Sequence, residues 1–131
     1  MRDKNDIERF VDAQNSPYGG YAVALQEMKD GQKCSHWIWY IFPQLRGLGR
    51  SFNSDYYGLA DKDEAKRYLE HPVLGPRLRE ITKAVLSHKG QVSLQHLMGS
   101  SIDVIKLKSC MQLFDEICPQ DDFAKVLNFE N

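Results

Sequence analysis

The stretch SHWIWYIFPQLRGLGRS, residues 35–51, carries both tryptophans of the chain, and its conformation decides how the rest is interpreted. It begins with a serine of the kind that caps helices, and Pro43 disfavours helix at the residue before it. The segment HWIWYIF between them has strand-like composition and is too short for its period to decide. We favour a helix because the neighbouring segments are helical. A helix that is apolar on nearly every side is typical of a core, so Trp37 and Phe42 are predicted to be buried.

Helical signals follow one another along the chain. Apolar spacing and capping residues predict helices within 6–14, 19–31, 35–43, 61–71, 72–90, 93–99, 100–119 and 121–129, with a glycine-rich loop over 46–59 that has room for one turn. In the long segment 100–119 the core candidates are Ile102, Ile105, Leu113, Phe114 and Ile117. The sequence therefore predicts an all-α fold, a compact single domain over residues 1–131 with about seven short helices in orthogonal-type packing.

Composition limits the classes of function. Charged residues make up 27% of the 131 residues and the net charge is −1, which argues against a nucleic-acid protein with a strongly basic surface. No apolar run approaches the roughly 18 residues that a membrane span needs, and the charged N-terminus lacks a signal-peptide core. We therefore expect a cytoplasmic protein without a membrane partner. Its three cysteines are predicted to be reduced thiols, and its oligomeric state is left open.

The segment QLRGLGRS combines glycines with two arginines. Gly47 and Gly49 permit close backbone approach, and Arg46 or Arg50 can hold a phosphate or carboxylate. Without a preceding strand and the remaining spacing, this is not a dinucleotide fingerprint. The alternatives are an ordinary turn with solvated arginines and an anion-binding loop beside the aromatic helix, which Arg50 followed by Ser51 would suit best.

Acidic residues and a lysine supply the other candidates. Asp103 and Lys106 share one stripe of a helix, either as a surface ion pair or with one of them facing inward for catalysis. Glu64 resembles a solvated helix face, yet it is retained beside Asp103 as a catalytic guess. No metal-ligand spacing links the four histidines, so neither a metal nor a cofactor is predicted.

Four blocks of the sequence, RFVDAQ, SHWIWYIFPQLRGLGRS, EAKRYLEHPVLGPRL and IDVIKLKSCMQLF, together resemble the bacterial domain-of-unknown-function family 1810. The resemblance covers nearly the whole chain in the same order. It implies an all-helical fold and no established activity. Some relatives carry the label calpastatin, a protease inhibitor, but such an inhibitor is expected to be extended and polar. The family's hallmark positions fall on His36, Trp37, Trp39, Phe42, Pro43, Gln44, Gly47, Gly49, Ser51, Tyr68, His71, Pro72, Leu74, Gly75, Lys106, Ser109 and Phe114.

The chain also resembles the helical NADAR-type domains, which are linked to cleavage of N-glycosidic bonds in ADP-ribose-related nucleotides. The shared features are an all-helical build, aromatic-rich segments and Leu74-Gly75 before a helix. No catalytic residue aligns, so none is transferred.

Two functions follow from these patterns. The first is binding or hydrolysis of a small phosphorylated ligand, nucleotide- or ADP-ribose-like, with an indole stacked on a base and an arginine on phosphate. Its catalytic candidates are His36, Asp103 and Glu64. Its ligand-binding candidates are Trp37, Trp39, Gln44, Arg46, Arg50, Ser51 and Lys106. The alternative is a non-catalytic protein-interaction or regulatory module that exposes an apolar patch.

Overall fold

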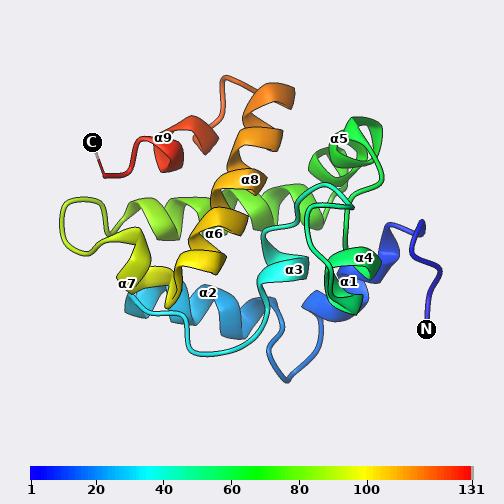
Figure 1. The fold of residues 1–131 in the computed structure, drawn as a ribbon, viewed down its shortest axis with the longest axis horizontal. Coiled ribbons are helices and arrows are strands. Elements are labelled where there is room, and N and C mark those ends of the chain that lie inside the picture. Colours follow the sequence, from blue (N-terminus) through cyan, green and yellow to red (C-terminus); the bar gives the residue numbers. More distant parts are fainter. Residues whose placement is uncertain (131) are drawn as a thin grey trace.

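Nine helices form the secondary structure of residues 1–130, the part of the chain that this computed structural model describes. They are α1 (Glu8–Gln14), α2 (Tyr21–Asp30), α3 (Ile38–Ile41), α4 (Phe52–Tyr56), α5 (Lys62–Glu70), α6 (Leu74–Leu86), α7 (Leu94–Met98), α8 (Ser101–Ile117) and α9 (Phe123–Leu127). The longest helix, α8, packs against α3, α5, α7 and α9 and runs across the direction of α6 (Figure 1). The predicted compact all-helical fold is confirmed.

The predicted count of about seven helices is too low: each of the eight segments expected to be helical contains one helix, and the loop segment 46–59 contains α4 as well. This helix begins where the Ser51 hydroxyl accepts a hydrogen bond from the Ser54 backbone N–H at 3.0 Å. The aromatic stretch is helical only for the single turn α3. The helix ends there because Phe42 turns out of helical conformation before Pro43.

The core confirms one prediction and corrects another. Trp37 and Phe42 are fully buried, as the central position of their segment predicts. Ile102 and Ile105 are 64% and 65% exposed, so their assignment to the core is wrong. The reason is helical phase: α8 turns a stripe with three- and four-residue spacing inward, and both isoleucines lie off it. The buried residues of α8 are Leu107, Cys110, Met111, Leu113 and Phe114.

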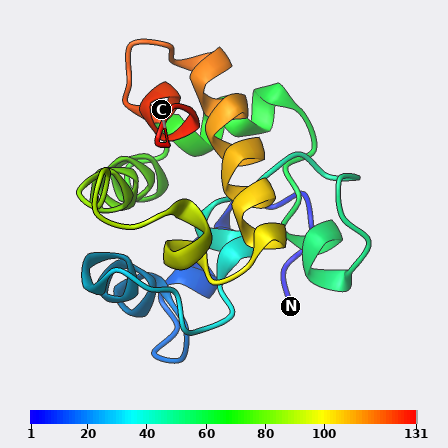
Figure 2. The same cartoon turned by 60° about the vertical axis from the view of Figure 1, so that its left-hand side comes forward.

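The loop that leaves α3 is fastened to the segment that follows α4. An isolated β-bridge joins Leu45 and Leu59, with the Leu59 N–H donating to the Gln44 carbonyl at 2.9 Å. The Arg46 N–H donates to the Leu59 carbonyl at 2.7 Å. Figure 2 shows this turquoise loop and the green α4 on one side of α8, with α2 and α6 on the other. The bridge therefore fixes the position of the loop between α3 and α4.

A buried ion pair joins α1 to α5 and to the end of α4. The Arg9 guanidinium lies 3.0 Å from the Glu64 carboxylate, and both side chains are almost fully buried. Its remaining N–H groups donate to the carbonyls of Tyr56 at 2.7 Å, Gly58 at 2.9 Å and Asp6 at 2.9 Å. The expectation that Glu64 lies on a solvated helix face is wrong, because Arg9 offers the full set of donors that lets a carboxylate leave water.

The Glu64→Gln variant tests this pair. Removing one charge leaves the Arg9 guanidinium buried and uncompensated, so we expect the free energy of unfolding to fall by about 3 kcal/mol. Urea denaturation followed by circular dichroism measures the loss. Glu70→Gln, an exposed position on the same helix, is the matched control and should change stability by less than about 0.5 kcal/mol. Equal effects of the two substitutions would contradict a structural role for the pair.

Candidate functional site

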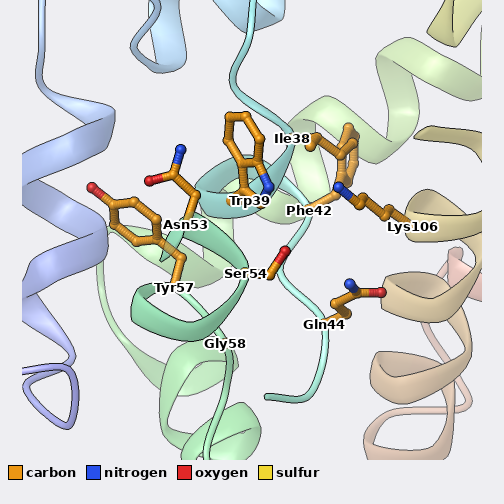
Figure 3. A pocket seen from close by; sticks show the side chains of 9 residues that line it. All are labelled: Ile38, Trp39, Phe42, Gln44, Asn53, Ser54, Tyr57, Gly58 and Lys106. Atoms are coloured by element: carbon orange, nitrogen blue, oxygen red, sulfur yellow. The ribbon is translucent and has the colours of Figure 1, made fainter. Parts of the chain in front are cut away.

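A hollow lies between α3, α4 and the first half of α8. Its wall combines the apolar and aromatic side chains of Ile38, Trp39, Phe42 and Tyr57 with the polar side chains of Gln44, Asn53, Ser54 and Lys106 (Figure 3). About 10 Å³ is free for the centre of a water-sized sphere, which is room for about one oxygen atom. We call it the donor hollow and define it by Trp39, Gln44, Ser54 and Lys106.

The donor hollow presents several hydrogen-bond donors, beside the acceptor oxygens of the Gln44 and Asn53 amides. The Trp39 Nε1–H is buried, and no atom of residues 1–130 accepts a hydrogen bond from it. The Lys106 ammonium lies 5.4 Å from the Trp39 ring centroid and has no ion pair within the same residues. The Ser54 hydroxyl accepts from Ser51 at 3.0 Å, which leaves its own hydrogen to donate. Figure 3 shows the polar atoms of Trp39, Lys106, Ser54 and Gln44 around the same region.

The loop approaches α4 closely because position 49 is a glycine. A Cβ atom at Gly49 would come within 2.4 Å of the Ser54 hydroxyl oxygen and 2.7 Å of its Cβ. Any side chain there would displace Ser54 from the wall of the hollow. Gly49 was predicted to permit close approach of the backbone. In the structure it lets the loop approach the protein's own α4 helix.

A wider groove continues from the donor hollow along α8. It has a volume of about 410 Å³ and shares Gln44, Ser54 and Lys106 with the hollow. We call it the α8 groove. The loop before α4 supplies Leu48, Gly49, Arg50 and Ser51, and α8 supplies Ile102, Ile105 and Ser109.

Five of the sequence-predicted ligand residues meet in this region. Trp39, Gln44 and Lys106 line the donor hollow, and Arg50 and Ser51 line the adjoining groove. The exposed Arg50 guanidinium has no hydrogen bond or ion pair with any of residues 1–130. The spatial convergence of an indole, two cations and a hydroxyl is therefore present, although the roles of these residues stay predictions.

Two other predicted ligand residues have structural partners instead. The Trp37 indole N–H donates to the Glu27 carboxylate at 2.8 Å, inside the core. The Arg46 guanidinium donates to the carbonyls of Lys4 at 2.7 Å and Asp55 at 3.0 Å, which ties the N-terminal segment to α4. Neither side chain lines the hollow or the groove.

The three catalytic candidates lie apart from the donor hollow and from one another. His36 is exposed ahead of α3 and lines neither the hollow nor the groove. The Asp103 carboxylate lies 2.9 Å from the Lys33 ammonium, a partner that spacing on one helix does not reveal. Glu64 is enclosed with Arg9, as described above. No aspartate, glutamate or histidine lines the hollow among the described residues.

Sequence reasoning missed Ser54 and Glu27. Ser54 belongs to the segment that was expected to be loop, and its only signal was the Ser51 cap three residues earlier. Glu27 accepts four hydrogen bonds, from the backbone of Cys34 and Ser35, the Ser35 hydroxyl and the Trp37 indole, at 2.6–3.0 Å. The sequence does not link Glu27 to the aromatic stretch, because the two meet only when the chain turns back after α2.

The described part of the chain shows neither a metal cluster nor a membrane-spanning helix. Residues 1–130 contain no group of three or more histidine, cysteine, aspartate or glutamate side chains placed to hold a metal ion. None of the helices described here has the length and apolar character needed to cross a membrane.

The fold and the hollow define an all-helical protein with a donor-lined recess beside its longest helix. The chain belongs to the family described as "Protein of unknown function (DUF1810)", which matches residues 4–129. Its fold is similar to the crystal structure of the conserved hypothetical protein Rv1873 from Mycobacterium tuberculosis, with a TM-score of 0.86 and 40% sequence identity. That similarity covers 96% of this chain and 87% of the other. Among curated proteins, none matches the chain.

Glu27 gives a pH-dependent test of the anchor that holds Trp37. Burial opposes ionisation of this carboxyl, but its hydrogen bonds from Ser35, Cys34 and Trp37 outweigh burial and lower its pKa from the ordinary 4.5. The ionised form therefore stabilises the fold above the unfolded pKa, and this contribution is lost as pH falls through the lower folded pKa.

We expect Glu27→Gln to lower the free energy of unfolding by about 1–2 kcal/mol at pH 7. The difference between the variant and the unmodified protein should shrink as pH falls below about 4. Urea denaturation at a series of pH values measures it, with Glu70→Gln as the exposed control. A difference that stays constant from pH 7 to pH 3 would contradict the stabilising role of the ionised carboxylate.

Proposed function

We propose that this protein binds a small ligand through an oxyanion, a carboxylate or a phosphate, held in the donor hollow. The observation that carries the proposal is the buried Trp39 Nε1–H, which has no acceptor among residues 1–130. A buried donor without a partner costs about 1–3 kcal/mol, so an acceptor that enters the hollow recovers that free energy.

Charge supports an anion over a neutral acceptor. Lys106 brings a positive charge to the hollow and Arg50 brings a second to the adjoining groove, and neither is neutralised by a carboxylate among the described residues. Hydrogen bonds from such groups to an ionised acceptor are about twice as strong as neutral ones. The hollow admits about one oxygen atom, so the rest of the ligand would lie in the α8 groove.

The phosphorylated ligand expected from the sequence belongs to this class of anions. Binding is proposed here without a reaction, because His36, Asp103 and Glu64 lie outside the hollow. The alternative of a protein-interaction module is favoured by one observation, the exposed Ile102 and Ile105 on the wall of the same groove. The two functions are compatible if the anion belongs to a larger partner.

The two tryptophans provide a direct test by nuclear magnetic resonance. Their indole N–H groups give separate signals, and Trp39→Phe identifies which one belongs to Trp39. Titration with sodium acetate, and separately with inorganic phosphate, at constant ionic strength should shift the Trp39 signal saturably. The Trp37 signal should stay in place because its N–H is already bonded to Glu27.

Variants on α8 test the charge. Lys106→Gln should weaken the binding of the effective anion by about tenfold or more, because it removes a charged donor from the hollow. Lys108→Gln, an exposed position two residues away, removes the same charge outside the hollow and should change affinity by less than about twofold. If neither acetate nor phosphate shifts the Trp39 signal saturably, the hollow is not an anion site and the proposal fails.

A further inference from the structure

We propose that the anion is the C-terminal carboxylate of a peptide whose last residues are apolar, with the peptide lying along the α8 groove. This inference rests on the proposed function, since it requires the donor hollow to bind an oxyanion. It goes further by naming the class of partner and the surface that holds the rest of it.

The groove is long enough for several residues of extended chain. Beyond Ser109 it passes into a second recess of about 210 Å³, which shares Leu48 and Ser109 with it and ends at Glu116. The residues of α8 that line the groove and the recess are three or four positions apart, so they lie on one face of the helix. From Lys106 to Glu116 this face measures about 15 Å, which matches about four or five residues in a strand-like conformation.

The apolar side chains of this surface lie next to the anion-binding end. Leu48, Ile102 and Ile105 are each 63–65% exposed and line the groove directly beside the hollow. In a peptide C-terminus, the last side chain branches from the carbon that carries the carboxylate. An apolar last residue therefore places an anion and an apolar group at the spacing that this surface offers. A nucleotide phosphate is joined to a polar sugar and would leave these three side chains in contact with water.

Polar side chains along the same walls favour a peptide over a fatty acid. Gln44, Ser51 and Ser109 line the groove, and Gln112 lines the second recess. These groups can bond the N–H and C=O groups of an extended peptide, which an alkyl chain lacks. The groove is also open to solvent, whereas binding sites for small apolar ligands bury most of the ligand surface.

The charge distribution sets the direction of the peptide. Lys106 and Arg50 lie at the hollow and beside it, and no carboxylate lines the described surface until Glu116. The Glu116 carboxylate lies 2.8 Å from the Lys62 ammonium. The free carboxylate of the peptide therefore belongs at the hollow, and the preceding residues run toward Glu116.

Two pools of acetylated pentapeptides test the inference with the full-length protein. Both have random residues at the first four positions and leucine, isoleucine, valine or phenylalanine at the last, but one ends in a free acid and the other in an amide. The Trp39 indole signal reports binding, with acetate, inorganic phosphate and octanoate titrated separately. We expect the acid pool to bind about tenfold or more tightly than both acetate and the amide pool. Ile105→Ser should weaken the acid pool by a larger factor than it weakens acetate.

The remaining outcomes separate this inference from the proposed function. If acetate or phosphate binds and the acid pool binds no tighter than acetate, the peptide inference is overturned while anion binding stands. Tighter binding of octanoate than of the acid pool also overturns it, in favour of a fatty acid. If the amide pool binds as well as the acid pool, the protein does not recognise the terminal carboxylate, and the peptide inference is overturned. If none of the probes shifts the Trp39 signal, both proposals fall together.

Discussion

The buried pair between Arg9 and Glu64 is the constraint on which the rest of the structure depends. A guanidinium in the interior must use its donors, and here they bond the backbone just after α4 as well as the carboxylate on α5. The carboxylate in turn accepts from the Ala60 backbone N–H at 2.9 Å. The pair thereby fixes the relative positions of α1, α5 and the end of α4, which are distant in sequence. Because this arrangement fixes the end of α4, it also places Ser54 at the hollow.

The donor hollow contrasts with the polar groups elsewhere in the interior. The Trp37 indole bonds the Glu27 carboxylate, while the Trp39 indole, two residues later, has no acceptor within the described chain. Native proteins pair nearly all buried polar groups, so an unpaired one is expected where a ligand binds. The exposed apolar residues of α8 begin beside this donor, where the proposed anion site and the proposed peptide surface meet.

The candidate residues that the structure brings together are mostly those of a single segment. Trp39, Gln44, Arg50 and Ser51 lie within one stretch of thirteen residues, so a single fold of the loop brings them together. Prediction was wrong for Glu64 and for Ile102, whose burial depends on which side of a helix meets the core. A short amphipathic pattern leaves that choice open, because more than one stripe of α8 is apolar.

The sequence by itself determined the all-helical class, most helix positions and the burial of Trp37, because capping, proline placement and apolar spacing act over a few residues. Only the tertiary structure decided which polar groups find partners. Arg46 and Asp103 were available for a ligand in sequence terms, yet contacts with Lys4 and Lys33 hold them in place. The Trp39 indole N–H has no acceptor among the described residues, and the Lys106 ammonium lies over the Trp39 ring without an ion pair in the same part of the chain. Hydrogen bonding is short-ranged, so chain folding settles which groups remain available to a partner.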